Sequence, residues 1–282
     1  MLTLKAYAKI NIVLEVLQKR DDSYHDIASI IQVIDIYDTL SFISAPDIEL
    51  ICNKPELNSS DNLIVQAAKL LQKVACCEKG VTIYLQKKIP VAAGLGGGSS
   101  DAAATLLALN KLWDLNFSIS QLHHFASTLG SDVPFFLYGN TALVEGRGDW
   151  VTPLPSPDSL PVIILHPDIT VANKTREMYF HLDASQFTSG HLAYEVAEQL
   201  QKDKDISSNS FYNVFDTVAS QVFPGHNEYI RKFLFSGAAT VHLAGSGPAM
   251  FTVMSNQNDA EIVTKQLQQS GLEAYLTRTL EN

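Results

Sequence analysis

Four glycines and two serines lie close together between Pro90 and Ser100, in the segment Pro-Val-Ala-Ala-Gly-Leu-Gly-Gly-Gly-Ser-Ser. Residues 81–86 before it alternate and are rich in β-branched types, which predicts a strand. Residues 102–113 after it are good helix formers, which predicts a buried helix. A glycine-rich turn that leads into a helix presents backbone N–H groups and the positive end of the helix dipole at one place. The segment therefore predicts an anion site, most often for phosphate, with a flexible connector as the alternative.

The spacing of these glycines excludes the best-known phosphate motifs. A P-loop requires Lys and then Ser or Thr after its last glycine, but Gly98 is followed by two serines. The dinucleotide fingerprint, counted from Gly94, would need a third glycine where this chain has Ser99. The H-R-D and D-F-G motifs that accompany a protein-kinase glycine loop do not occur in the sequence.

Other residues have two interpretations each when they are considered alone. Lys9 and Asn11 share one face of an otherwise apolar extended segment, so Lys9 is either an edge residue in solvent or a group held for a partner. Asp132 precedes Val-Pro, where a carboxylate often caps a helix or turn. Tyr24 and His25 follow a charged turn and are either an exposed pair or part of a binding site.

The elements that must position these residues mix strands and helices without strict alternation, which predicts an α+β fold. The clearest boundary signal is the run of three prolines in 153–157. Before it, we expect extended segments in 2–17, 37–43, 48–52 and 141–144, and helices in 61–77 and 118–129. After it, we expect strands in 162–165, 240–243, 250–254 and 273–276, and helices near 172–181, 191–203, 208–220 and 259–269.

Composition narrows the possible partners. The chain has 282 residues and a formal net charge of −10, and it has no basic block, so neither nucleic acid nor an anionic membrane is expected as a partner. Its three cysteines, two of them adjacent, match neither a disulfide framework nor a zinc pattern. No signal-peptide pattern and no long apolar run occurs, so we expect a cytoplasmic protein.

Together these segments resemble the GHMP kinases (galactokinase, homoserine, mevalonate and phosphomevalonate kinases). Three blocks match in order: the strand with Lys9, the segment 90–100 with its helix, and the turn Ala-Gly-Ser-Gly-Pro at 244–248. The finer resemblance is to a family member of the non-mevalonate isoprenoid pathway that acts on a cytidylated sugar alcohol. It rests on four motifs: Ala-Lys-Ile-Asn at 8–11, Tyr-His at 24–25, the glycine-rich stretch 94–103 and Gly-Ser-Asp-Val-Pro at 130–134. The family often has glycine at the position of Ser23.

The resemblance implies a two-domain architecture. A ribosomal protein S5 domain 2-like, ATP-binding domain would span 1–152, and a ferredoxin-like GHMP kinase domain would span 153–282, with the active-site cleft between them. It also implies direct transfer of the γ-phosphate of ATP to a hydroxyl of a small molecule, with Mg²⁺ between the β- and γ-phosphates. We expect a monomer or a weak homodimer.

The resemblance also implies roles for single residues. Asp132 would be the catalytic aspartate and Lys9 its partner, with Ser100 as a Mg²⁺ contact. ATP would be bound by the following residues: Pro90, Val91, Ala92, Ala93, Gly94, Leu95, Gly96, Gly97, Gly98, Ser99, Ser100, Asn62 and Leu63. The acceptor would be bound by the following residues: Asn11, Tyr24, His25 and Tyr179.

Two other functions remain open at this stage. Another small-molecule kinase of the family, of the homoserine or mevalonate type, would share the glycine-rich turns but would have no need for Tyr24 and His25. A nucleotide sensor that has lost catalysis would not need both Lys9 and Asp132.

Overall fold

The computed structural model describes residues 1–202, 206 and 210–281. The chain forms two compact units, each made of several segments. The first unit contains residues 1–8, 36–91 and 96–139, and the second contains residues 9–35, 92–95 and 140–282. These bounds are not those of the domains 1–152 and 153–282, which stay a prediction.

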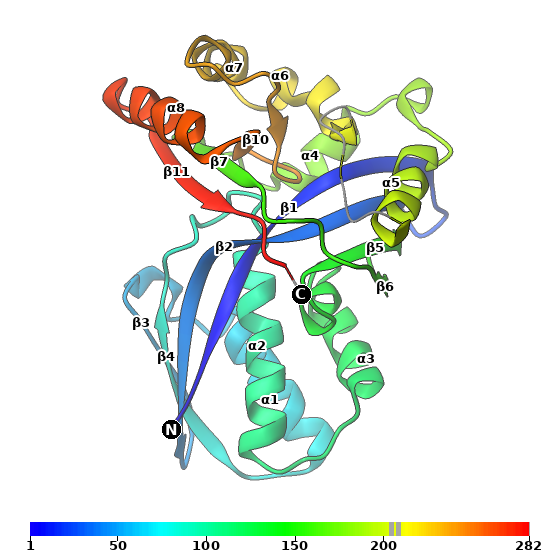
Figure 1. Cartoon of the computed structure of the whole chain (residues 1–282). Coiled ribbons are helices and arrows are strands. Elements are labelled where there is room, and N and C mark those ends of the chain that lie inside the picture. Colours follow the sequence, from blue (N-terminus) through cyan, green and yellow to red (C-terminus); the bar gives the residue numbers. More distant parts are fainter. Residues whose placement is uncertain (203–205, 207–209, 282) are drawn as a thin grey trace. The chain divides into compact units, whose positions relative to one another are not determined.

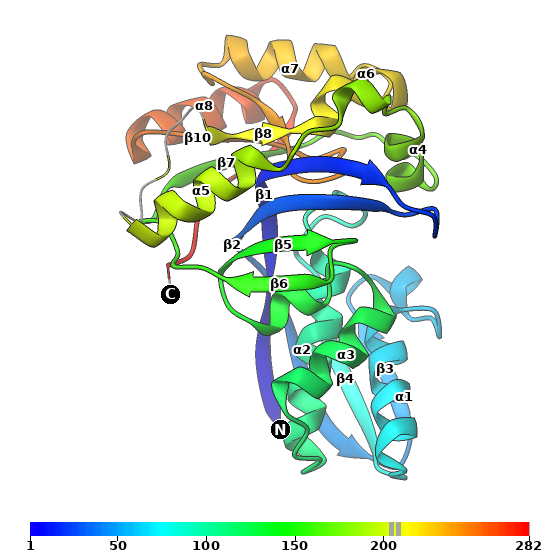
Figure 2. The same cartoon turned by 90° about the vertical axis from the view of Figure 1, so that its right-hand side faces the viewer.

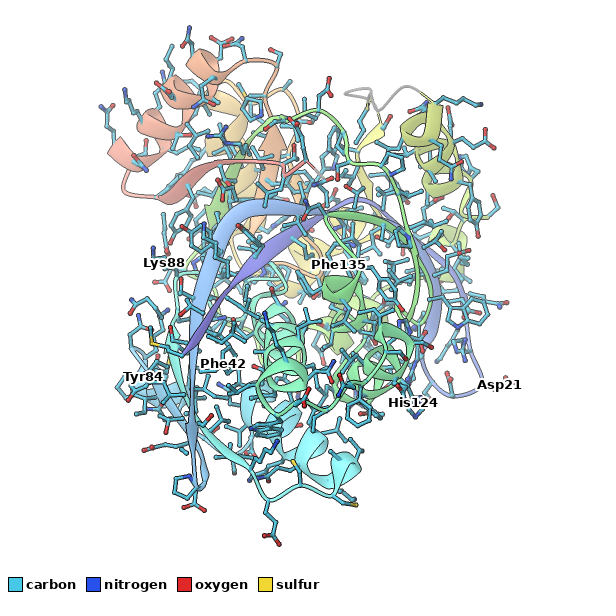
Figure 3. All side chains as sticks on the ribbon, turned by 60° about the horizontal axis from the view of Figure 1, so that its bottom comes forward. Asp21, Phe42, Tyr84, Lys88, His124 and Phe135 are labelled. Atoms are coloured by element: carbon cyan, nitrogen blue, oxygen red, sulfur yellow. The ribbon has the colours of Figure 1, made fainter. Side chains whose placement is uncertain are left out.

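The first unit packs three helices on a sheet (Figures 1 and 2). Its strands are β3 (Ile48–Cys52), β4 (Gly80–Gln86) and the parts of β1 (Leu2–Lys19) and β2 (His25–Ala45) that fall in this unit. Its helices are α1 (Leu63–Ala75), α2 (Gly97–Leu112), α3 (Ile119–Leu129) and the short η1 (Pro55–Leu57) and η2 (Pro134–Leu137). Alternation along the strands buries Phe42 and leaves Tyr84 of the neighbouring strand 45% exposed (Figure 3).

Local sequence signals account for the starts of two of these helices. Asn62 is the N-cap of α1, where its side chain accepts a hydrogen bond from the backbone N–H of Ile64. Ser118 and Gln121 form the predicted capping box of α3. Helix α2, in contrast, begins at Gly97 and not at residue 102, so the prediction of its start was wrong. Glycine disfavours helix interiors, but the first turn lacks most intrahelical bonds and tolerates it.

The second unit contains the rest of β1 and β2, which continue into a sheet with β5 (Thr141–Gly146), β6 (Trp150–Pro153) and β8 (Tyr212–Asn213). A separate four-stranded sheet has the order β11-β7-β10-β9 and is antiparallel throughout. Its strands are β7 (Pro161–His166), β9 (His242–Leu243), β10 (Met250–Val253) and β11 (Glu273–Arg278). With helices between β7 and β9 and between β10 and β11, this order is the predicted ferredoxin-like arrangement.

The helices of the second unit depart from the predicted pattern in two places: the predicted helix over 208–220 is wrong, and the helix over 226–235 was not predicted. They are α4 (Lys174–Phe180), α5 (His191–Lys202), α6 (Ala219–Val222), α7 (His226–Phe235) and α8 (Gln257–Gln269), with short turns η3 (Ala184–Gln186) and η5 (Val214–Thr217). The predicted helix over 208–220 was wrong, because residues 212–213 pair as a strand with β1 and only short helical turns follow. Residues 203, 208 and 209 of the predicted helices lie outside the described residues.

The fold is a mixture of helices and mainly antiparallel strands, which confirms the predicted α+β class. Within the part of the chain that the structure describes, no helix has the length and apolar character needed to cross a bilayer.

Candidate active site

Lys9 is held inside the second unit. Its side chain is 4% exposed, and its Nζ donates a hydrogen bond of 2.7 Å to Oδ1 of Asn11. Nδ2 of Asn11 donates to the hydroxyl of the buried Ser29 at 2.7 Å, and that hydroxyl donates to the carbonyl of Val13 at 2.6 Å. The structure therefore supports the interpretation that Lys9 is a group held in place, and not the interpretation that it is an edge residue in solvent.

The orientation of the Asn11 amide follows from both of its neighbours. The single hydroxyl proton of Ser29 goes to a carbonyl, so Ser29 can only accept from Asn11. The ammonium group of Lys9 can only donate, so it must face the amide oxygen. The relay therefore fixes which way Asn11 points and, through it, where the charge of Lys9 lies.

Two glycine turns meet beside Lys9. The backbone N–H of Lys9 donates to the carbonyl of Leu95 at 2.9 Å, and that of Ala249 donates to the carbonyl of Ala93 at 3.0 Å. Gly94 has φ +88°, and a Cβ there would lie 2.8 Å from the carbonyl oxygen of Gly247. A Cβ on Gly245 would lie 2.8 Å from Nζ of Lys9, so no side chain fits at this position either. The close approach explains why the chemistry-bearing segments are rich in glycine.

Helix α2 gives the glycine-rich segment its anion-binding potential. Gly96 is the N-cap, with φ 73°, and the first intrahelical bond runs from the N–H of Ser100 to the carbonyl of Gly96 at 2.9 Å. The N–H groups of the first turn, Gly97 to Ser99, precede that bond and have no carbonyl four residues back within the helix. They are available to a phosphate at the positive end of the helix dipole.

The predicted adenine contacts lie in the same unit as this helix start. A Cβ on Gly98 would lie 3.9 Å from Cδ1 of Leu63, so Leu63 lies beside the glycine-rich segment. Asn62 is less available, because its amide caps α1 and also donates to the carbonyl of Leu57 at 3.0 Å.

A buried charge cluster lies directly beneath the start of α2. Nζ of Lys87 donates to Asp38 and to Asp101, both at 2.6 Å, and the three side chains are at most 5% exposed. A Cβ on Gly97 would lie 3.0 Å from this Nζ. Burial opposes the charge of Lys87, but the two carboxylates raise its pKa above the usual value. Burial, opposed by Lys87, raises the pKa of Asp101 to about 7.

The ring of His25 stacks on that of Tyr179, with centroids 4.6 Å apart and an angle of 13° between planes. The edge of Tyr179 in turn meets Phe215, with centroids 4.9 Å apart. Burial, together with the nearby charge of Lys19, lowers the pKa of His25, so the ring is neutral at pH 7. A neutral imidazole offers one donor and one acceptor, which suits recognition of the edge of a base.

The other predicted residues are placed separately. Tyr24 is 51% exposed, with the guanidinium of Arg147 5.5 Å from its ring centroid, so it does not join the stack of His25 and Tyr179. Asp132 is half-buried in the first unit, in the turn between α3 and η2. The N-cap of η2 is Val133, which makes no side-chain capping hydrogen bond, so Asp132 is not the N-cap of this turn.

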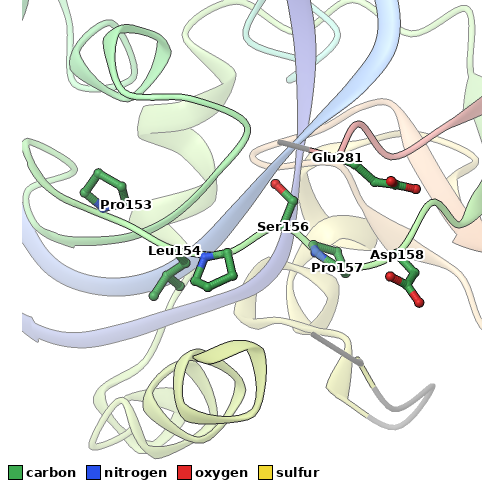
Figure 4. Close-up of a pocket in the computed structure, with 7 residues that line it drawn as sticks. Pro153, Leu154, Ser156, Pro157, Asp158 and Glu281 are labelled. Carbon is green, nitrogen blue, oxygen red and sulfur yellow. The ribbon is translucent and has the colours of Figure 1, made fainter. Parts of the chain in front are cut away.

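Sequence reasoning missed several polar residues that support this site. Ser29 had a weak signal as a lone hydroxyl in an apolar run. Lys87 and Asp38 belong to no recognisable pattern, and Asp101 directly follows the glycine-rich segment but was assigned no role of its own. A surface cavity of about 430 Å³ between residues 153–158 and Glu281 contains none of the predicted site residues (Figure 4).

Comparison with known proteins places the chain in a family. The family model "GHMP kinases N terminal domain" matches residues 62–140. The chain is 41% identical to the 4-diphosphocytidyl-2-C-methyl-D-erythritol kinase of Dehalococcoides mccartyi, over 99% of both proteins. It is 40% identical to that of Thermodesulfovibrio yellowstonii, over 94% of both.

Solved structures agree as well. A crystal structure of 4-(cytidine 5'-diphospho)-2C-methyl-D-erythritol kinase superposes with a TM-score of 0.84 at 30% identity and covers 100% of both chains. Mevalonate kinase from L. major matches with a TM-score of 0.75 at 14% identity, over 100% of this chain and 97% of that one, which shows the shared fold alone.

The fold and the segment 62–140 are those of the GHMP kinases, which use ATP as phosphoryl donor. Within that class, the chain belongs to the family of the 4-diphosphocytidyl-2-C-methyl-D-erythritol kinases.

Proposed function

We propose that the protein transfers the γ-phosphoryl group of ATP to the 2-hydroxyl of 4-diphosphocytidyl-2-C-methyl-D-erythritol, giving the 2-phosphate and ADP in isoprenoid precursor biosynthesis. The observation that carries the proposal is the identity of 41% over 99% of both chains with a kinase of this name. The buried Lys9 and the two glycine turns beside it supply the groups that phosphoryl transfer needs.

The roles of single residues are part of the proposal. Phosphoryl transfer has a loose transition state, so positioning and charge neutralisation matter more than proton removal. Asp132 orients the acceptor hydroxyl and takes its proton late, and Lys9 offsets charge on the transferring group. The first turn of α2 binds phosphate, Leu63 lies near the adenine, and Tyr24, His25 and Tyr179 bind the cytosine.

The residues at the start of α2 also suit Mg²⁺. The hydroxyl of Ser100, in the first turn of α2, is a hard oxygen donor. Mg²⁺ keeps several waters and binds substrate phosphates, so one or two protein oxygens suffice. When bound, the ion neutralises charge on the β- and γ-phosphates.

The test of the reaction is ADP release from Mg·ATP with four acceptors: the cytidylated methylerythritol, homoserine, mevalonate and galactose. We expect turnover on the first acceptor alone. Turnover on one of the others would keep the phosphoryl-transfer chemistry and reject the substrate. ATP binding without turnover on any acceptor would support the sensor function.

The test of the catalytic residue is Asp132→Asn, with Asp35→Asn as the matched control, because Asp35 is exposed on β2. We expect the first variant to keep less than a few per cent of wild-type turnover and the control to keep all of it. Substantial turnover in folded Asp132→Asn would reject the role of this carboxylate.

A further inference from the structure

A second cavity in the second unit lies beside the start of the glycine-rich segment. It has a volume of about 430 Å³ and is lined by the following residues: Ala92, Val171, Asn173, Lys174, Thr175 and Arg176. Ala92 belongs to the glycine-rich segment, and the other five precede or begin helix α4. None of these five residues was predicted as a site residue, although Tyr179 of the same helix was. The reaction described above does not use them.

The charge of this cavity differs from that of the whole protein. The chain has 30 acidic and 20 basic residues, yet the lining has two cations and no carboxylate. Arg176 is exposed, and the described residues form no ion pair with it. Its guanidinium therefore remains available to an anion without first breaking a salt bridge.

The lining is connected to the glycine turns by hydrogen bonds. Nζ of Lys174 donates to the hydroxyl of Ser246 at 3.1 Å, and the hydroxyl of Thr175 lies 2.9 Å from the same oxygen. Ser246 lies between Gly245 and Gly247, which pack against Lys9 and Gly94. The cavity therefore belongs to the same constellation of segments that holds Lys9.

Backbone strain is also concentrated here. Ala92 has φ 55° and Asn173 has φ 52°, so this one cavity is lined by two of the six non-glycine residues that have positive φ among the residues the structure describes. For alanine this conformation is unfavourable, because the Cβ atom lies too close to the carbonyl oxygen. Such residues are frequent at ligand sites, where the surrounding structure holds them.

We propose that this cavity is an anion subsite, in which Lys174 and Arg176 bind a phosphate group of one of the two substrates. A guanidinium binds phosphate through paired hydrogen bonds, and an ammonium adds a point charge. The phosphate comes either from ATP or from the diphosphate of the cytidylated acceptor, and this choice of sources rests on the proposed function.

The first test is direct binding of inorganic pyrophosphate, measured by calorimetry on the whole protein. Arg176→Gln is compared with Arg231→Gln, which removes the same charge from an exposed position on α7. We expect the affinity to fall about tenfold in Arg176→Gln, the size of one charge-assisted hydrogen bond, and to stay unchanged in the control. Lys174→Gln should also weaken binding. An affinity within twofold of wild type in both cavity variants would overturn the subsite.

The second test identifies the source of the phosphate from the Michaelis constants of Arg176→Gln. A rise of about tenfold in KM for ATP assigns the subsite to the nucleotide, and a similar rise for the acceptor assigns it to the acceptor diphosphate. If neither KM changes, the subsite does not serve these substrates and the proposal is wrong. A wild-type protein inactive on the cytidylated acceptor would reject the proposed function instead, while the pyrophosphate titration would still decide the subsite.

Discussion

Nδ2 of Asn11 donates to the buried hydroxyl of Ser29 at 2.7 Å, which turns the amide oxygen of Asn11 toward the ammonium group of Lys9. Ser29 lies on the neighbouring strand β2 and is fully buried. A buried hydroxyl on a neighbouring strand thus sets the position of the charge that we place in phosphoryl transfer.

Removal of this hydroxyl should slow the reaction more than it weakens binding. We expect Ser29→Ala to lower kcat about tenfold with little change in KM for ATP, because Asn11 can then turn and release Lys9. Ser29→Thr keeps the hydroxyl and should restore most of the rate. Steady-state kinetics on both variants decide this. A loss of stability in Ser29→Ala without a change in kcat would mean that the hydroxyl is merely structural.

The cluster of Lys87, Asp38 and Asp101 should be important for stability. Lys87→Met leaves two buried carboxylates without their cation, which typically costs about 3–5 kcal/mol. Lys88→Met is the matched control, since Lys88 is the exposed neighbour and its ammonium lies 5.6 Å from the ring centroid of Tyr37. We expect the control to change the free energy of unfolding by less than about 0.5 kcal/mol. Urea unfolding measures both, and equal small effects would show that the cluster contributes little.

Ser23 has φ 69°, in the left-handed region that favours glycine. We expect Ser23→Gly to raise the free energy of unfolding by roughly 0.5–1 kcal/mol, because relief of strain exceeds the added entropy of the unfolded chain. Ser23→Ala keeps the strain and should give no gain. Equal stability of the glycine and alanine variants would show that this turn carries no strain.

His226 should make the protein less stable in mild acid. Both of its ring nitrogens are buried and have no hydrogen-bond partner among the residues that the structure describes. Burial lowers the pKa of His226, although Asp216 opposes the shift. Since the folded pKa lies below the unfolded value, the unfolded chain binds more protons, and stability is lost as pH falls below about 6.5.

We therefore expect His226→Leu to gain stability relative to wild type between pH 7.5 and 5.5, by at most about 1.4 kcal/mol per pH unit. His124→Leu, at an exposed position of α3, is the control and should show no such trend. Unfolding by urea at the two pH values measures the difference. A constant difference between His226→Leu and wild type would contradict the prediction.

The sequence predicted those elements whose signals are local. The capping box of Ser118 and the turn at 244–248 between β9 and β10 are examples. It did not predict the first half of β2, residues 25–36, because burial of both faces removes the alternation that identifies a half-buried strand.

The residues of the site likewise differ in whether the sequence alone could identify them. The glycine turns and His25 with Tyr179 could be found from sequence and resemblance, and the structure brings each set together. Ser29, Lys87 and Arg176 could not be found, since each acts through neighbours that only the folded chain supplies.

The most direct test of the central claim is ³¹P NMR of the products formed from Mg·ATP and 4-diphosphocytidyl-2-C-methyl-D-erythritol. We expect one new phosphomonoester, on the 2-hydroxyl, in equal amount to the ADP formed. ADP with free phosphate and no phosphorylated acceptor, or an ester on another hydroxyl, would contradict it.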